Sequence, residues 1–397
     1  MKVAIVCDYL NVYGGGERTL EAILEIYPEA TVYTSLYDPS KFRNDSPIGR
    51  AKVVSFFDSQ GLCFERPGGV EKFFQRLVLD CARTLKLPIS LFPKHFTFIF
   101  PYFFERIDLS GFDVVISIGT IWAKGVKTTK DQTHVFYCLT PPRFLYKYPS
   151  ETSKRNVWYY RPFTVLLDHW LRIWDFNAAQ KPNEILVISD EVGRRVKKFY
   201  RRDSLVIYPP VEVFHPEGVN RRRAHPQGGA PEEKYFLIVS RLASYKGIDV
   251  AIRACNELKL SLKIVGTGRE QEKLKALAGP TIEFLGFKSD EEIDNIYLGA
   301  RALIFPTPDE DFGIVPLEAN AHGVPVIAHK SGGPLETLVE GKTGVYFNNI
   351  QELEAILVNF DPSKFNYQDC VANARRFSQE AFKMELRQFI ETNLPAS

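Results

Sequence analysis

Short runs rich in valine and isoleucine alternate with longer amphipathic segments along most of this 397-residue chain. Such alternation is typical of βαβ units, in which each strand of a parallel sheet is followed by a helix that covers the sheet. The nearly continuous hydrophobicity of the short runs indicates strands that are buried on both faces. We therefore predict an α/β fold built from doubly wound, Rossmann-like sheets.

The expected strands form two series, separated by residues 216–233, where proline, glycine and arginine dominate and the apolar periodicity stops. We expect an N-terminal Rossmann-like domain of residues 1–207, a second of residues 208–376, and a C-terminal helix within 377–397 that packs back on the first domain. Two such domains facing each other would enclose a ligand cleft, because these sheets bind ligands at the carboxyl ends of their strands. The expected strands are Lys2–Cys7, Thr31–Leu36, Lys52–Phe56, Asp113–Ile118, His134–Leu139 and Glu184–Ser189, then Tyr235–Ser240, Leu260–Val265, Thr281–Leu285, Ala302–Phe305 and Val324–Ala328.

Composition excludes several classes of protein. The formal net charge of +2 gives no global field for nucleic acid. The six cysteines form no CxxC pair, so we expect reduced thiols and no metal site. No apolar stretch reaches the roughly 18 residues of a membrane span, and the start of the chain does not resemble a signal peptide. We expect a cytoplasmic protein.

Three glycines, Gly14 to Gly16, stand in the first expected strand-to-helix turn. Glycine there allows the backbone to approach a ligand, and the start of a helix offers N–H groups to an anion. The dinucleotide fingerprint is incomplete, because Thr19 stands where its third glycine belongs. A bare tight turn therefore remains an alternative, and a nicotinamide-dependent dehydrogenase is disfavoured.

Two cations follow the first expected strand of the second half of the chain. Arg241 and Lys246 lie at its carboxyl end and together would neutralise a diphosphate. Gly266 closes the next strand, where it either admits a nucleotide or forms a simple turn.

The segment 310–318, EDFGIVPLE, carries the most chemical information. A helix beginning near Gly313 would direct its unpaired N–H groups toward a diphosphate. Glu318 lies about one and a half turns into that helix, where its carboxylate would accept hydrogen bonds from ribose hydroxyls. Glu310 precedes the helix and suits the hydroxyls of a transferred sugar. The donor-binding candidates in this segment are Phe312, Gly313, Ile314, Val315 and Glu318.

With these motifs the chain resembles the retaining glycosyltransferases of family 4, which have the GT-B fold, across nearly its whole length. Within that family it looks closest to bacterial mannosyltransferases of O-antigen and polysaccharide assembly. The motifs that carry the resemblance are GGGER (14–18), YPPVEV (208–213), SRLASYKGIDVAI (240–252), IVGTG (264–268), EDFGIVPLEA (310–319), GVPVIA (323–328) and SGGPLETL (331–338).

The resemblance implies metal-independent transfer of a hexose, with retention of configuration, from a nucleotide-diphospho-sugar. GDP-mannose is favoured over UDP-sugars, and no cofactor is required. Arg241 and Lys246 would bind the diphosphate, Glu310 the donor sugar and Glu318 the ribose. Gly15 and Gly16 would line the side of the site formed by the first domain.

One position departs from the family. Its members commonly carry a histidine just after the strand expected at His134–Leu139, and this chain has Leu139 in that place. The side chain of leucine cannot hydrogen-bond a sugar or a phosphate, although its carbonyl oxygen could still face the anomeric carbon. Leu139 and Arg143 are the candidates on the acceptor side. His134 lies at the wrong end of the strand and is expected in the core or on the surface.

The acceptor is a saccharide or a lipid-linked saccharide. Residues 142–181 interleave basic and aromatic side chains, which suits either contact with an anionic bilayer at the inner face of the plasma membrane or an ordinary aromatic core with a solvated basic face. Two other functions remain open: a non-catalytic partner that binds a sugar nucleotide, and an epimerase or phosphorylase on the same fold.

Overall fold

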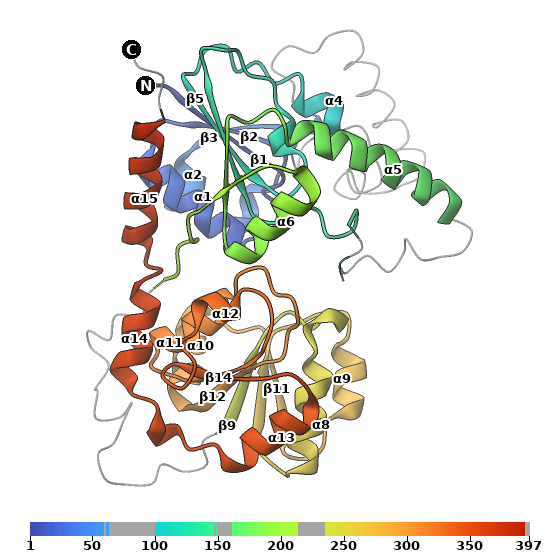
Figure 1. The fold of residues 1–397 in the computed structure, drawn as a ribbon, viewed down its shortest axis with the longest axis vertical. Coiled ribbons are helices and arrows are strands. Elements are labelled where there is room, and N and C mark those ends of the chain that lie inside the picture. The colour runs from blue at the N-terminus through green and yellow to red at the C-terminus, as the bar shows by residue number, and fades with distance from the viewer. Residues whose placement is uncertain (59–60, 63–99, 147, 149–160, 213–234, 394–397) are drawn as a thin grey trace. The chain divides into compact units, whose positions relative to one another are not determined.

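The computed structural model describes residues 1–58, 61–62, 100–146, 148, 161–212 and 235–393. The chain divides into two compact units, which we treat separately (Figure 1). Unit 1 contains the described residues up to Tyr208 and those from Phe382 onward, and unit 2 contains Pro209–Ala381. The polar segment predicted at 216–233 lies outside the described residues.

Unit 1 is built on an eight-stranded sheet with the order β4-β3-β2-β1-β5-β6-β7-β8. All neighbouring strands are parallel except β3 and β4. All five residues of β1 are buried, which explains why its sequence is uniformly apolar. The strands are β1 (Val3–Cys7), β2 (Thr31–Tyr37), β3 (Lys52–Asp58), β4 (Gly61–Leu62), β5 (Val114–Gly119), β6 (Thr133–Cys138), β7 (Glu184–Val187) and β8 (Leu205–Val206).

Helices pack against this sheet through apolar faces. One buried cluster contains Ala4 and Val6 of β1, Leu171 of helix α5 (Arg161–Ala178) and aromatic residues of helix α4 (Phe100–Phe104). The last part of the chain also belongs to unit 1, since Phe382 packs edge-on against Tyr137 and Lys383 forms an ion pair with Glu25. The helices are α1 (Gly15–Ile26), α2 (Pro47–Arg50), α4 (Phe100–Phe104), α5 (Arg161–Ala178), α6 (Asp190–Tyr200) and α15 (Gln379–Thr392), the last of which begins in unit 2.

Unit 2 has a six-stranded parallel sheet with the order β11-β10-β9-β12-β13-β14. Alternate residues of each strand face opposite layers: Ala302 and Ile304 of β12 join the core on one side, and Leu303 and Phe305 join the core on the other. The strands are β9 (Tyr235–Val239), β10 (Leu262–Val265), β11 (Ile282–Gly286), β12 (Ala300–Phe305), β13 (Val326–His329) and β14 (Gly344–Phe347).

The helices of unit 2 cover both faces of its sheet (Figure 1). They are α8 (Ile248–Glu257), α9 (Gln271–Leu277), α10 (Asp290–Gly299), α11 (Ile314–Ala321), α12 (Pro334–Thr337), α13 (Ile350–Asn359) and α14 (Tyr367–Arg375). The α/β prediction, with two doubly wound sheets, is confirmed. In the described part of the chain, no helix is both long enough and apolar enough to cross a bilayer.

The strand order reverses at one point in each sheet, between β1 and β5 in unit 1 and between β9 and β12 in unit 2. Loops that leave two such strands at their carboxyl ends diverge to opposite faces of the sheet and leave a crevice for ligands. These two switch points are therefore where functional side chains are expected.

Candidate active site

At the switch point of unit 2, Lys246 and Glu310 form an ion pair. Lys246 ends the short 3-10 helix Ser244–Lys246 that follows β9, and Glu310 lies in the loop after β12. The Lys246 Nζ atom donates to Oε2 of Glu310 at 2.6 Å, with the side chains 12% and 20% exposed. Two residues separated by 64 positions in sequence thus meet because β9 and β12 are neighbours.

Glycine allows the two loops to approach closely. Gly247 has φ of +64°, and a Cβ atom there would come within 2.6 Å of the carbonyl oxygen of Pro306. On the same loop, Thr307 donates its hydroxyl to the carbonyl oxygen of Lys246 at 3.3 Å. Any side chain at position 247 would push the loop of Lys246 away from the loop of Glu310.

A third loop, carrying Ser331 to Gly333, packs behind Glu310. The N–H of Gly333 donates to the carbonyl oxygen of Glu310 at 2.8 Å, and Asp309 donates its N–H to the hydroxyl of Ser331 at 3.0 Å. A Cβ atom at Gly332 or Gly333 would collide with the backbone of Glu310 or Phe312. The SGG motif therefore holds the backbone of Glu310 in place.

Helix α11 begins after Gly313, which has φ of +94° and provides no side-chain cap. The N–H groups of Ile314 and Val315, in the first turn, have no partner within the helix. The positive end of the helix dipole lies there as well, so this end of α11 suits an anion. The side chain of Phe312 is buried against Phe377, so any contact of Phe312 with a ligand would come from its backbone.

Glu318 lies in α11, is half-buried and accepts a hydrogen bond from the Tyr297 hydroxyl at 3.3 Å. Tyr297 stacks on His322, and His322 pairs with Asp294 at 2.9 Å. This arrangement limits the rotamers of Glu318.

Arg241 is exposed and donates to the Tyr245 hydroxyl at 3.2 Å. Behind its loop, a Cβ atom at Gly266, where φ is +124°, would collide with the carbonyl oxygen of Ser240. Gly266 is therefore required where the loops after β9 and β10 touch. The structure brings Arg241, Lys246, Gly266, Glu310 and the start of α11 to one end of one sheet.

Unit 1 has its own cavity at its switch point, with a volume of about 210 Å³. Gly16 and Leu139, both predicted site residues, line it, and a Cβ atom on Gly16 would lie 3.0 Å from Cδ1 of Leu139. Gly15 is the first residue of α1, directly beside this wall. Arg143 is half-buried and does not line the cavity.

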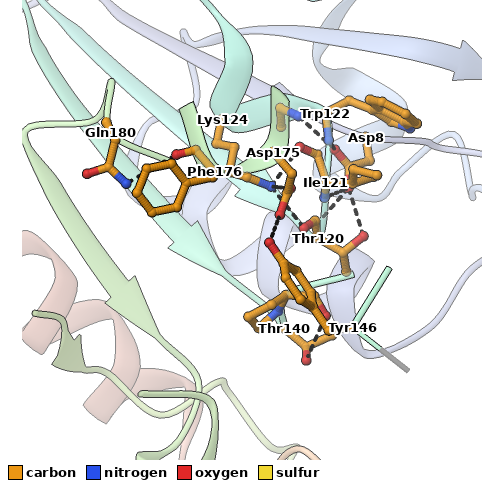
Figure 2. Close-up of polar contacts among 12 residues, drawn as sticks. Asp8, Thr120, Ile121, Trp122, Lys124, Thr140, Tyr146, Asp175, Phe176 and Gln180 are labelled. Atoms are coloured by element: carbon orange, nitrogen blue, oxygen red, sulfur yellow. Dashed lines mark hydrogen bonds and ion pairs between the residues drawn. The ribbon is translucent and has the colours of Figure 1, made fainter. Parts of the chain in front are cut away.

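Asp8 directly follows β1, and no motif pointed to it. Its buried carboxylate accepts hydrogen bonds from the backbone N–H groups of four consecutive residues, 120–123, at 2.7 to 3.0 Å, and from the Thr120 hydroxyl at 3.1 Å (Figure 2). This one side chain fixes the loop that leaves β5, and with it one wall of the cavity.

The same loop is held from its other side by a fully buried ion pair. Lys124 donates to the carbonyl oxygens of Thr120 and Ile121 and contacts Asp175 of α5 at 2.6 Å, and both charged side chains are 0% exposed (Figure 2). The Tyr146 hydroxyl donates to Asp175 at 2.8 Å. Burial raises the pKa of Asp175, and the ammonium group of Lys124 opposes that rise.

His134 lies in the core of unit 1, 0% exposed, with Nε2 2.8 Å from the hydroxyl of Ser117. Burial lowers its pKa from 6.5 to about 3. The folded protein therefore resists protonation of this ring. The resulting loss in the free energy of unfolding is absent above pH ~6.5 and grows by ~1.4 kcal/mol per pH unit as the pH falls toward about 3.

Between pH ~6.5 and about 3, the free energy of unfolding of the native protein should fall as the pH falls. We expect this fall to be less steep in His134→Gln, by up to ~1.4 kcal/mol per pH unit, which is the contribution of one proton. Urea unfolding at a series of pH values measures that slope. His169→Gln, which changes an exposed histidine of α5, is the matched control and should leave the slope unchanged. Equal slopes in His134→Gln and the native protein would contradict the assignment.

Comparison with known proteins adds to this geometry. Residues 220–375 match the sequence model of a family described as glycosyl transferases group 1. This part of the chain is similar to group 1 glycosyltransferases. It contains Arg241, Lys246, Gly266, Glu310 and Glu318.

Relatives and solved structures agree with the match. An uncharacterized glycosyltransferase of Methanocaldococcus jannaschii is 24% identical over 225 residues, which is 51% of this chain and 61% of that protein. The GDP-mannose-dependent alpha-mannosyltransferase of Corynebacterium glutamicum is 30% identical over 158 residues, 36% of this chain and 38% of that protein. The matches thus span about three fifths and about two fifths of these relatives.

The structure of Anabaena HepE in complex with UDP aligns with a TM-score of 0.64 at 17% identity, covering 99% of this chain and all of that one. The fold is that of GT-B glycosyltransferases.

The side chains that support the candidate site of unit 2 and the cavity of unit 1 were not predicted. Tyr297 behind Glu318 gave no sequence signal, because its position depends on how α10 packs beside α11. Asp8 did give one, since it directly follows an apolar strand at the carboxyl end where ligand loops begin. The basic residues Lys147, Lys154 and Arg155 of the predicted bilayer contact lie outside the described residues.

Proposed function

We propose that this chain is a retaining, metal-independent glycosyltransferase that moves a hexose, with mannose favoured, from a nucleotide-diphospho-sugar to a saccharide or lipid-linked saccharide. The observation that carries the proposal is the Lys246–Glu310 pair at the switch point of unit 2, beside the uncapped start of α11. The ammonium group of Lys246, the carboxylate of Glu310, which can accept hydrogen bonds from hydroxyls, and the first N–H groups of α11 thus lie at one end of one sheet.

In this mechanism the diphosphate accepts hydrogen bonds from Lys246 and Arg241 and from the N–H groups of Ile314 and Val315. These donors stabilise the negative charge that develops as the bond from the anomeric carbon to the diphosphate oxygen breaks. The acceptor hydroxyl attacks the same face of the sugar, and its proton passes to the departing diphosphate. Glu310 holds hydroxyls of the donor sugar, and Glu318 those of the ribose.

The donor is proposed from the relatives. Two that align with parts of this chain, from Corynebacterium glutamicum and Mycolicibacterium smegmatis, are named as GDP-mannose-dependent mannosyltransferases. Thermal-shift measurements with GDP-mannose, UDP-glucose, UDP-N-acetylglucosamine and the free nucleotides test this choice. NMR of the product then tests retention, because the anomeric configuration of product and donor must agree. Inversion, or no stabilisation by any nucleotide, would contradict the proposal.

Glu318→Ala is expected to weaken binding of the nucleotide about tenfold or more, because buried ribose hydroxyls would lose a charged acceptor. Calorimetry with the tightest-binding nucleotide measures this loss. Glu272→Ala, which removes a carboxylate that is 87% exposed on α9, is the control and should bind normally. Unchanged affinity in Glu318→Ala would remove Glu318 from the donor site.

A non-catalytic sugar-nucleotide-binding partner is the second candidate function, and Leu139 favours it. The cavity of unit 1 has leucine where related enzymes commonly carry histidine. This alternative predicts binding of the donor without release of nucleoside diphosphate in the presence of any acceptor. Release of the diphosphate from a bound donor together with a new glycosidic bond excludes it, and also excludes an epimerase.

We further propose that the acceptor is reached at the inner face of the plasma membrane through α5. Four large apolar side chains on one face of this helix, Val165, Leu166, Trp170 and Ile173, are between 47% and 72% exposed. Such a patch is uncommon on a protein surface that only meets water. Residues 164–202 hold eight basic and five acidic residues, which favours an anionic lipid surface.

Sedimentation with phosphatidylcholine vesicles, with and without phosphatidylglycerol, tests this contact. Leu166→Glu should lower binding to the anionic vesicles about tenfold, because it removes an inserted apolar side chain and adds repulsion. Val358→Glu, which changes an apolar residue of α13 in unit 2 that is 61% exposed against 72% for Leu166, is the matched control. Binding that is absent, or insensitive to salt, would contradict the proposal.

A further inference from the structure

The cavity of unit 1 has an apolar floor. Five of its lining residues, Cys7, Leu10, Leu20, Ile118 and Leu139, present apolar groups or a thiol, and the first four are almost completely buried. The volume of about 210 Å³ is below the ~300 Å³ at which pockets for drug-sized ligands begin. The cavity therefore suits one small ring and not an extended chain.

Apart from Asn11 and Glu17, the polar side chains that line this cavity make hydrogen bonds within the protein. A carboxylate has about four acceptor sites, and Asp8 accepts from four backbone N–H groups and one hydroxyl. Both the N–H and the hydroxyl of Thr120 donate to Asp8. The Tyr9 hydroxyl accepts from the indole N–H of Trp122 at 2.6 Å, so this hydroxyl offers a ligand chiefly its own O–H as a donor. A ligand hydroxyl pressed against Leu20 or Leu139 would lose its water and gain no hydrogen-bond partner from these side chains.

Glu17 supplies the polar side of the cavity. It is the third residue of α1, and its half-buried carboxylate interacts with the backbone N–H groups of Gly14 and of Glu17 itself. Unlike Asp8, whose acceptor sites are filled, the Glu17 carboxylate has acceptor sites beyond these two, so a hydroxyl of a ligand can donate to it. The lining therefore combines a carboxylate acceptor with apolar side chains, among them Leu20 of the same helix.

We infer that this cavity binds one monosaccharide ring that carries a methyl group, with the methyl group against Leu139 and Leu20 and ring hydroxyls directed to Glu17. A 6-deoxyhexose and an N-acetylhexosamine share this chemistry. The inference deepens the proposed function, on which it rests in taking the ligand to be a sugar. Leu139 then determines specificity: an apolar residue there selects the methyl group that a polar residue would reject.

Gly16 sets the width of the same cavity. Because a Cβ atom on Gly16 would lie 3.0 Å from Cδ1 of Leu139, alanine at this position would narrow the space above the floor. Gly16→Ala should therefore weaken binding of every monosaccharide without reversing the preference among them.

Saturation-transfer NMR and titration with free reducing monosaccharides, which carry no methyl group at the anomeric oxygen, test the inference on the full chain. The probes are matched pairs that differ by one hydroxyl: mannose and D-rhamnose, galactose and D-fucose, glucose and quinovose. A further pair, glucose and N-acetylglucosamine, distinguishes the two sources of the methyl group. In at least one pair, the member with the methyl group should bind about tenfold more tightly, because its partner would bury an unpaired hydroxyl. Its methyl protons should receive the strongest saturation.

Leu139→Asn, which keeps the size of the side chain and makes the floor polar, should abolish the preference. Leu277→Asn, on the surface of unit 2, is the matched control and should preserve it. Equal or tighter binding of the fully hydroxylated members, or no binding of any probe to the native protein, would overturn the inference. The methyl saturation is measured on the native chain, so a failure of Leu139→Asn to fold leaves the test intact. Nucleotide binding by unit 2 is measured separately, so failure of the donor assignment is distinguished from failure here.

Discussion

Lys246→Ala is expected to lower the turnover of sugar transfer about 10³-fold. A single preorganised donor to a developing negative charge contributes roughly 10²- to 10³-fold to a rate. Here the loss is compounded, because Glu310 would be left without its cation at 2.6 Å and would place an unpaired carboxylate beside the diphosphate. Release of nucleoside diphosphate from the tightest-binding donor, with and without acceptor, measures the effect.

Glu310→Ala should also reduce turnover severely, and the double variant should lose less than the sum of the two single losses, since the residues interact directly. Lys273→Ala is the control, because Lys273 pairs with Glu270 in a similar way on an exposed turn at the start of α9. Circular dichroism and the thermal unfolding curve establish that each variant is folded. Near-normal transfer by both single variants would remove the pair from the active site.

Asp8→Ala is expected to lower the free energy of unfolding of unit 1 by ~4 kcal/mol or more. It removes the partner of four backbone N–H groups, of which those of Ile121, Trp122 and Ala123 belong to buried residues. Each buried polar group left without a partner costs about 1–3 kcal/mol. Urea unfolding followed by tryptophan fluorescence measures the change, because Trp122 lies in the loop that is released.

Asp108→Ala is the matched control. Asp108 also accepts a backbone N–H and a hydroxyl, both from Ser110, but its side chain is exposed, so water can replace the lost contacts. We expect a change of about 1 kcal/mol or less. Nucleotide binding by unit 2 should survive in Asp8→Ala, which separates a local loss in unit 1 from general misfolding. Similar losses in the two variants would contradict the role assigned to Asp8.

Most strands of both sheets could be predicted from the sequence, because a strand that is buried on both faces consists of consecutive apolar residues. Strand β1 is entirely buried and reads VAIVC. The strands that were missed lack this signal. Strands β4 and β8 have only two residues each, at the two edges of their sheet, and β14 begins with Gly344 and is only partly buried.

The site of unit 2 could be predicted because each functional residue follows a recognisable strand. Once β9 and β12 are placed in a parallel sheet, the loops of Lys246 and Glu310 must leave it at the same edge. The buried ion pair of unit 1 could not be located in this way, because it depends on how α5 packs against the loop after β5. One available signal was overlooked: Asp175 shares a helical face with the buried residues Leu171 and Ala178.

The glycines at 247, 266, 332 and 333 place backbone against backbone among four separate loops of unit 2. Loops locked together in this way have little entropy to lose when a nucleotide sugar arrives, so binding energy is spent on recognition and not on ordering the protein. The same locking restricts how the site can diverge. Insertions or deletions in any one loop would disturb the others, so a change of donor among descendants of this chain is expected to arise by exchanging side chains on a conserved backbone.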